Sequence, residues 1–316
     1  MAAQPFTTPV LFLIFNRPDT TEKVFQRIRD IQPRRLFVSA DGPRQHKMGE
    51  DRLCAETRKI VEKVDWKCEL QTNFSKKNLG CRIGVSSGID WFFRHVAEGI
   101  ILEDDCLPDI SFFRFCETLL EYYRNDERIM HIGGANFQDG NTRGDGSYYF
   151  SNINHVWGWA TWKRAWGKYD IAISSYPELL KQNILPHLFP NSHIEKFWKK
   201  KFELAYNNKI DTWDIQWQYA MSVNNGLAVI PNKNLVANIG FHDTATHTID
   251  KFNTLANIPT SAINNIIHPS QIIPDFNADS YAFRKYFSPP KVKKLWYLIM
   301  RKINILKIFS NHFLIL

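Results

Sequence analysis

The stretch that decides the fold is residues 99–105, GIILEDD, in which a short apolar run ends in three adjacent carboxylates. A continuous apolar run is typical of a strand buried on both faces of a parallel sheet. Three neighbouring carboxylates repel one another unless a cation or hydrogen-bond donors neutralise them. Mg²⁺ and Mn²⁺ prefer oxygen ligands and often take only one or two from the protein, with phosphate oxygens completing the shell. The stretch predicts a buried strand that ends in a metal-diphosphate site, with a solvated acidic turn as the alternative.

The residues before this stretch alternate short apolar runs with segments of helical spacing. Strands are expected at 9–15 (PVLFLIF), 35–40 and 68–74, and helices at 18–31 and 84–97. Strand–helix alternation predicts a parallel sheet with helices on both faces. The expected fold class is therefore α/β, with a mostly parallel central sheet flanked by helices.

The second half of the chain has a different composition. Seven of the ten tryptophans lie between Trp157 and Trp217, and a polar helical region follows the aromatic run HVWGWATWKRAW. No internal repeat or low-complexity linker separates the halves. We expect one continuous domain in two parts, residues 1–145 and 146–279, followed by a basic amphipathic tail at 280–316.

The overall composition is that of an ordinary globular protein. Of the 316 residues, 44% are apolar and 23% are charged, which excludes wholesale disorder. No run of 18 uncharged apolar residues predicts a membrane-spanning helix. The start, MAAQPFTTP, does not resemble a secretory signal. The five cysteines form no CxxC pair, which favours reduced thiols in the cytoplasm over disulfides or a zinc site.

The net charge of +8 belongs to the tail. Eight of the 40 Lys and Arg residues, and none of the 32 Asp and Glu residues, follow residue 279. The neutral body argues against a nucleic-acid partner. Residues 285–316 mix cations with Leu, Ile, Phe and Trp, which is typical of an amphipathic segment on an anionic membrane surface. An oligomerisation helix, or a tail packed on the body, is the alternative.

Polar side chains follow three of the expected strands, where ligands of such sheets bind. Arg17 follows the first strand, and its planar guanidinium suits a phosphate. Asp41 ends the second strand, where a carboxylate can accept from a base or a ribose hydroxyl. Arg82 opens the helix before the acidic strand. Each alone is typical of a surface charge or a helix cap, but together they indicate a pocket for a nucleotide diphosphate.

Motifs spread over about residues 8–250 resemble a bacterial group of nucleotide-diphospho-sugar transferases with the GT-A fold. They are FNRP, SADGPR, NLGCRIGVSSGI, GIILEDDCLPDISFF, HVWGWATW, TWDIQWQYA and NIGFHDTATHT. The chain is also similar, more distantly, to the animal N-acetylglucosaminyltransferases that begin complex N-glycan branches. The resemblance implies an inverting, metal-dependent glycosyltransferase that uses a nucleotide-diphosphate sugar, a UDP-sugar by expectation.

By that resemblance, Asp105 binds the Mn²⁺ or Mg²⁺ ion that bridges the diphosphate of the donor. Glu103 and Asp104 correspond to residues that contact the ribose and sugar hydroxyls of the donor. Arg17 corresponds to an arginine on the phosphate, and Asp41 to the acid that contacts the base. Arg82 corresponds to a further arginine of the donor site. The loop centred on Gly158, with Trp159, resembles the loop that borders the donor sugar and admits the acceptor. His247 matches a C-terminal histidine that binds the metal or the diphosphate. His242 stands where glycine is expected and is the alternative for that role.

Asp214 matches the acid opposite the anomeric carbon. Transfer to a hydroxyl requires its deprotonation, for which a carboxylate in hydrogen-bond reach is a suitable base. Asp211 lies three residues earlier on the same helical face and competes for the role. Either acid is otherwise a helix cap or a first-turn charge. Trp157 or Trp213 is expected to stack on a sugar, whereas the other tryptophans are expected in the core.

The expected acceptor is a glycan or glycolipid in lipopolysaccharide, capsule or other surface polysaccharide synthesis, with the protein peripheral on the inner face of the plasma membrane. Two other functions remain as alternatives. A sugar-nucleotide pyrophosphorylase shares the sheet architecture but needs a glycine-rich basic loop after the first strand, and FNRPDTTEK contains no glycine. A non-enzymatic membrane-binding protein would act through the basic tail and leave the acidic motifs unused.

Overall fold

The computed structural model describes residues 6–241, 255–256 and 258–287. Its first half alternates strands and helices as the sequence predicts. The elements in chain order are β1 (Val10–Ile14), α1 (Pro18–Ile31), β2 (Arg35–Ala40), α2 (Glu50–Lys59), η1 (Ile60–Lys63), β3 (Glu69–Phe74), α3 (Gly80–His95) and β4 (Glu98–Glu103). Helix α2 and the short η1 are additions that the sequence interpretation did not contain.

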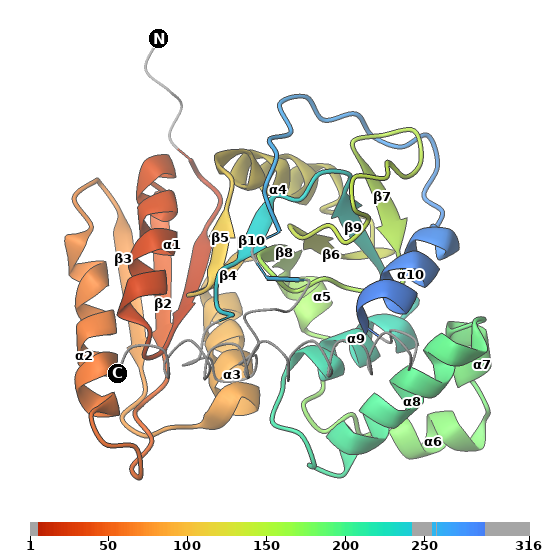
Figure 1. The fold of residues 1–316 in the computed structure, drawn as a ribbon, viewed down its shortest axis with the longest axis horizontal. Helices are drawn as coiled ribbons and strands as arrows, with labels where there is room; N and C mark the ends of the chain where they lie inside the picture. The colour runs from red at the N-terminus through yellow and green to blue at the C-terminus, as the bar shows by residue number, and fades with distance from the viewer. Residues whose placement is uncertain (1–5, 242–254, 257, 288–316) are drawn as a thin grey trace, which may run out of the picture.

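The strands form one eight-stranded sheet in the order β3-β2-β1-β4-β8-β6-β9-β7, and β5 and β10 form a separate two-stranded ribbon (Figure 1). Neighbours from β3 to β4 run parallel, as do β6 and β9, whereas β8 is antiparallel to both β4 and β6. The remaining strands are β5 (Cys106–Pro108), β6 (Ile129–Gly133), β7 (Tyr148–Ser151), β8 (Trp159–Trp162), β9 (Leu227–Pro231) and β10 (Val236–Asn238). The predicted α/β class, with a large central sheet flanked by helices, is confirmed.

Helices cover both faces of the sheet. One core contains the inner sides of α1 and α4 (Ile110–Tyr122), and the other contains those of α3, α5 (Lys163–Trp166) and α9 (Asp214–Val223). A third apolar cluster joins α9 to three helices, which are α6 (Tyr176–Lys181), α7 (Leu185–Leu188) and α8 (Ser192–Tyr206). Because β8 lies between β4 and β6, strands from before and after residue 145 share one continuous sheet.

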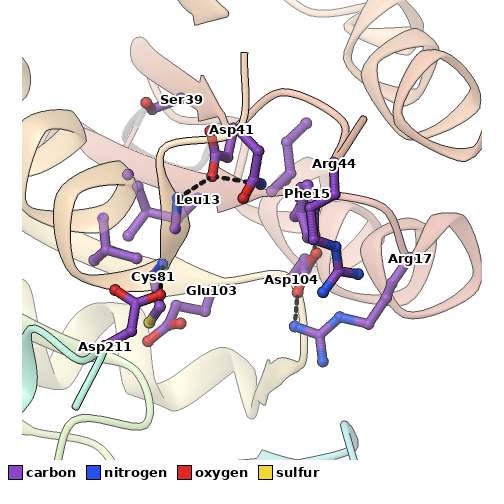
Figure 2. Close-up of a pocket in the computed structure, with 15 residues that line it drawn as sticks. Leu13, Phe15, Arg17, Ser39, Asp41, Arg44, Cys81, Glu103, Asp104 and Asp211 are labelled. Carbon is purple, nitrogen blue, oxygen red and sulfur yellow. Dashed lines mark hydrogen bonds and ion pairs between the residues drawn. The ribbon is translucent and has the colours of Figure 1, made fainter. Parts of the chain in front are cut away.

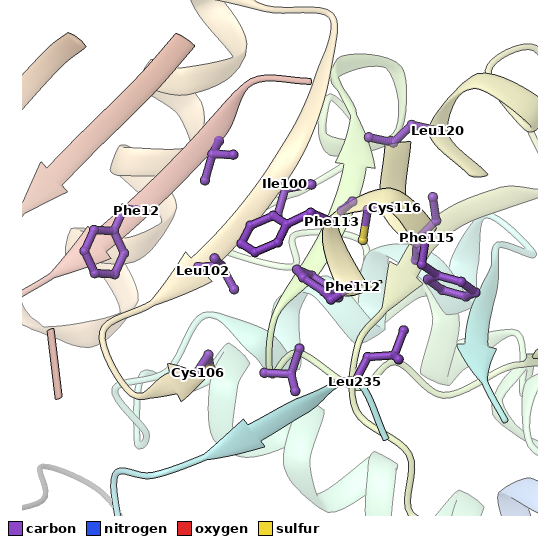
Figure 3. Close-up of a cluster of buried hydrophobic side chains, with 14 of the residues drawn as sticks. Phe12, Ile100, Leu102, Cys106, Phe112, Phe113, Phe115, Cys116, Leu120 and Leu235 are labelled. Carbon is purple, nitrogen blue, oxygen red and sulfur yellow. The ribbon is translucent and has the colours of Figure 1, made fainter. Parts of the chain in front are cut away.

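The acidic strand end is fixed by the helix that follows it. Asp109 caps α4 by accepting from the backbone N–H of Ser111 at 2.8 Å. Phe112 and Phe113 are then fully buried against β4 and the β5–β10 ribbon (Figure 3). Removing one such phenylalanine side chain typically costs about 3–5 kcal/mol. The PDxxFF segment therefore anchors the turn that carries residues 103–105.

Glycines bring α3 close to the carboxyl end of β2. A Cβ atom on Gly88 would lie 2.8 Å from the Ser39 hydroxyl oxygen, and one on Gly84 would lie 3.2 Å from Asp41 Oδ2. Glycine at these positions, one helical turn apart, lets the helix approach the strand that ends in Asp41. The N-terminus of α3 therefore lies beside the predicted site.

The expected tail begins inside the packed body. Helix α10 (Phe276–Ala282) continues into η2 (Phe283–Phe287), and Ala282 and Phe283 are buried. Tyr281 and Lys285 each donate to Asp139 at 2.5 Å. Residues 288–316, together with His242 and His247, lie outside the described residues. Within the described ranges, no helix combines the length and apolar character that crossing a bilayer requires.

Candidate active site

A cavity of about 210 Å³ opens at the carboxyl ends of β1, β2 and β4, where ligands of such sheets bind (Figure 2). Four of the predicted site residues line it, namely Arg17, Asp41, Glu103 and Asp104. Asp211 borders it from the second half of the chain. The three strand ends chosen from the sequence therefore meet at one place.

Arg17 holds the acidic strand end together. One guanidinium nitrogen pairs with Asp104 and another donates to Asp105 Oδ2 at 2.8 Å. Burial lowers the pKa of Arg17, but the charges of Asp104 and Asp105 outweigh that effect and raise it, so the guanidinium stays charged. Its Nε–H is buried and has no acceptor among the described residues. A buried N–H in this state is a donor available to a ligand anion.

The carboxylates of the strand end differ in their surroundings. Burial and the charges of Asp105 and Asp104 raise the pKa of Glu103. Asp104 is buried and accepts from the Phe15 backbone N–H at 3.1 Å, while Arg17 pairs with its other oxygen. Asp104 thus fixes the turn after β1 to the end of β4. An acidic cluster that exceeds its cationic partners attracts a further cation.

The backbone of residues 238–240 closes over Asp105. The Ile239 N–H donates to the Asp105 carbonyl at 2.8 Å, next to the pairing of β5 with β10. A Cβ atom on Gly240 would lie only 2.2 Å from Asp105 Oδ2. Glycine is therefore required at this position for the present placement of the Asp105 carboxylate. The motif NIGF thus packs directly on the predicted metal ligand.

The residues fit a cation that takes a single carboxylate from the protein. Asp105 Oδ1 has only a 3.6 Å contact with the Cys106 thiol, so this oxygen is available to a metal. In the described part of the chain, no group of three or more His, Cys, Asp or Glu side chains forms a metal site by itself. Such an ion would need phosphate oxygens or water for the rest of its shell, as Mg²⁺ usually does in nucleotide sites.

Asp41 is occupied by its own chain. Its carboxylate accepts from the backbone N–H groups of Gly42, Leu79 and Gly80 at 2.8–3.1 Å. The Asn78 side chain adds a fourth donor at 2.9 Å. Burial raises the pKa of Asp41, and these hydrogen bonds oppose the rise. Asp41 lines the cavity, and its oxygens organise the start of α3.

Arg44 is a cavity residue to which the sequence interpretation assigned no role. Its guanidinium pairs with the buried Glu50 and lies 5.4 Å from the centre of the Phe15 ring. Asn16 donates to the same Glu50 carboxylate at 2.9 Å. Arg44 ends the motif SADGPR, which placed it at a strand end. Its partner is on the unpredicted helix α2, so the sequence did not reveal the contact.

Asp211 and Asp214 have different partners. Asp211 accepts from the backbone N–H groups of Cys81 at 3.0 Å and Arg82 at 2.9 Å, in the first turn of α3. Asp214 begins α9, is partly buried and accepts from the Thr212 hydroxyl. Burial raises the pKa of the Cys81 thiol in the cavity wall, and the charges of Glu103 and Asp214 raise it further. The Arg82 side chain bonds to Asn208 outside the cavity lining.

No residue of the aromatic loop lines the cavity. Gly158 has a left-handed φ of 61°, and its carbonyl accepts from the Gly134 N–H at 2.7 Å. The Trp159 side chain is fully buried and stacks on Trp213 at 5.4 Å, so neither ring lines the cavity. Trp157 is partly buried against Phe137 and Phe241. In this structure the loop supports the site through its backbone and core packing.

No protein-family model matches the sequence, and no curated protein matches it. Some solved structures show a similar arrangement over part of their length. HddC from Yersinia pseudotuberculosis is 9% identical, with a TM-score of 0.32, over 50% of this chain and 78% of that one. Residues 1–349 of TarS from S. aureus are 9% identical, with a TM-score of 0.42, over 73% of this chain and 60% of that one. A UDP-glucose pyrophosphorylase complexed with UDP-glucose is 8% identical, with a TM-score of 0.37, over 71% and 90%. All three scores are below 0.5, so the function of this chain is inferred from its own side chains.

Proposed function

We propose that the chain is an inverting, divalent-metal-dependent glycosyltransferase that uses a nucleotide-diphosphate sugar, with UDP as the expected nucleotide. One observation carries the proposal. The partly buried Arg17 side chain holds Asp104 and Asp105 at the end of β4, and its buried Nε–H has no acceptor among the described residues. Paired acids for a cation, beside a free cationic donor for phosphate, suit a metal-diphosphate ligand.

The donor half of the site serves the leaving group. Mg²⁺ or Mn²⁺ held by Asp105 would supply charge stabilisation to the departing nucleoside diphosphate. Arg17 adds a fixed positive charge and a planar donor group beside the same phosphates. Glu103 and Asp104 face the donor's ribose and sugar hydroxyls in this proposal, and Asp41 keeps the start of α3 in place around them.

The acceptor half supplies the base. Asp214 takes the proton from the acceptor hydroxyl as its oxygen bonds to the anomeric carbon. The bond from that carbon to the phosphate oxygen breaks, and its electron pair leaves with the nucleoside diphosphate. Attack opposite the leaving group inverts the anomeric centre. The Asp214 carboxylate is near enough to the cavity to affect the pKa of Glu103 and Cys81 there.

The proposed acceptor is a glycan or glycolipid of a surface polysaccharide, made on the inner face of the plasma membrane. This part of the proposal depends on the basic and apolar composition of residues 285–316. Vesicles of anionic and neutral lipid test it directly. Binding to the anionic vesicles should disappear on raising the salt or on ending the chain after residue 287.

Turnover with a panel of nucleotide sugars, with and without Mn²⁺, tests the chemistry. Asp105→Asn should lower the release of nucleoside diphosphate by at least about 10²-fold, and Asp214→Asn should lower it by about 10²–10⁴-fold. Asp51→Asn, on the exposed side of α2, is the matched control and should retain full activity.

Two results would contradict the proposal. Formation of pyrophosphate and a nucleotide sugar from a nucleoside triphosphate and a sugar phosphate would show a pyrophosphorylase instead. Full activity of Asp214→Asn would remove that residue from the role of base. The three-residue connection between β1 and α1, in which Arg17 lies, favours the transferase, because it leaves no room for a glycine-rich triphosphate loop.

A further inference from the structure

The connection between α8 and α9, residues 207–213, is bonded to the opposite half of the chain. Asp211, which borders the cavity beside Cys81 (Figure 2), accepts from the N–H of Cys81 at 3.0 Å and from that of Arg82 at 2.9 Å. Both amides belong to the first turn of α3, where Leu79 provides no side-chain cap. Asp211 thus supplies to α3, from a distant part of the chain, the acceptor that the residue directly before a helix normally supplies.

Two more contacts hold the same surfaces together. The Arg82 guanidinium donates to the Asn208 side-chain oxygen. Gly80 leaves space for the carboxylate, because a Cβ atom there would lie 2.7 Å from Asp211 Oδ2. Gly80 also has a φ of 79°, which favours glycine. The start of α3 and the α8–α9 connection therefore fit together at three consecutive residues of α3, 80–82.

The two residues after Asp211 lead directly to the proposed base. The Thr212 hydroxyl donates to Asp214 Oδ1. Trp213 is buried and stacks on Trp159 with ring centres 5.4 Å apart. Displacement of Asp211 would therefore move Thr212 and free the Asp214 carboxylate to rotate, while Trp213 kept the helix in the core.

We propose that Asp211 is a positioning residue, which holds the α8–α9 connection on the first turn of α3 and thereby fixes the orientation of the Asp214 carboxylate. Both oxygens of Asp211 already accept backbone N–H groups, whereas Asp214 accepts only the Thr212 hydroxyl in the described structure. Asp211 is thus engaged in structure, and Asp214 is the acid that remains for the acceptor. The catalytic part of this inference rests on the proposed function.

The test compares Asp211→Ala with Asp170→Ala. Asp170 is a matched control, because it accepts from the N–H groups of Ala172 at 2.9 Å and Ser174 at 2.6 Å and does not line the cavity. Asp211→Ala should lower kcat by about 10²-fold, as expected for a misplaced reacting group, with little change in the KM of the donor. Asp211→Asn, which keeps one acceptor oxygen, should recover part of that loss. Asp170→Ala should leave both constants unchanged.

Amide hydrogen exchange provides a readout that does not depend on turnover. Residues 80–83 and 208–214 should exchange faster in Asp211→Ala and at the wild-type rate in Asp170→Ala, because local opening follows the loss of local contacts. Unchanged exchange would overturn the inference, and so would faster exchange with an unchanged kcat. A rise in the donor's KM with kcat unchanged would instead make Asp211 a donor-binding group. If the wild-type chain transfers no sugar, the proposed function has failed, while exchange still decides whether Asp211 holds the connection.

Discussion

A histidine behind the site makes the stability of the protein sensitive to acid. His131 on β6 is fully buried and accepts at Nδ1 from the Trp217 indole N–H, at 3.2 Å. Since an indole N–H only donates, the His131 proton is on Nε2, which donates to the His155 carbonyl at 3.1 Å. The ring also stacks on Trp159 at 5.1 Å. The neutral ring therefore belongs to the same aromatic packing that holds Trp213 and the start of α9.

Burial lowers the pKa of His131 to about 3. Unfolding restores the ordinary histidine pKa of about 6.5. The unfolded chain therefore binds a proton below pH 6.5 that the folded chain refuses, and stability is lost as the pH falls from 6.5 towards 3. At pH 4.5, two units below the unfolded pKa, the loss from His131 is about 3 kcal/mol.

Urea unfolding at pH 7.5 and 4.5 measures this loss. His131→Asn should lower stability at both pH values, because the His155 carbonyl loses its donor, at a cost of about 1–3 kcal/mol. Its fall in unfolding free energy between the two pH values should be smaller than that of the wild type by about 3 kcal/mol. The exposed His46, changed to Asn, serves as the control. Equal falls in the wild type and His131→Asn would refute the reasoning.

Three other predictions concern a group with the opposite pH response, the proposed metal ligand Asp105 and the C-terminal helix. Burial raises the pKa of Asp279 to about 7, so this group stabilises the fold below pH 4 and loses that contribution as the pH rises through 7. Measured by urea unfolding, the free energy of unfolding of the wild type should include a fall of about 3 kcal/mol between pH 5 and 8 that is absent in Asp279→Asn. Gly240→Ala should push the Asp105 carboxylate aside and lower transfer by about 10²-fold, with the unfolding midpoint measured in parallel to exclude general damage. A chain that ends after residue 280 should have a midpoint about 6 °C or more below that of a chain that ends after residue 287, because the buried Phe283 is lost.

Local patterns in the sequence predicted which strand ends meet at the cavity. The apolar run before Glu103 and the polar residues after each strand follow from the rules of parallel sheets, and the structure brings Arg17, Asp41 and the acidic strand end to one cavity. Helix α2 was missed, although its Glu50 holds Arg44 at the site. Only Glu50, Cys54 and Thr57 of its ten residues are buried, and two of these three are polar. Hydrophobic periodicity is therefore a weak signal for this helix.

The roles of individual acids depend on contacts that no local pattern contains. The sequence interpretation assigned Asp41 to the base of the donor and left Asp211 as a rival base or a local helix cap, yet each accepts backbone N–H groups at the start of α3, and Asp211 does so across 130 residues of chain. The same surroundings explain why α3 begins at a glycine with a left-handed φ, since a side chain at Gly80 would displace Asp211. Two carboxylates thus take the place of a local cap, one from each half of the chain. Because the first N–H groups of α3 donate to carboxylates from both halves of the chain, they join the end of β2 to the segment that leads into α9. The position of the proposed base Asp214 therefore depends on how well the cavity wall around Asp41 is ordered.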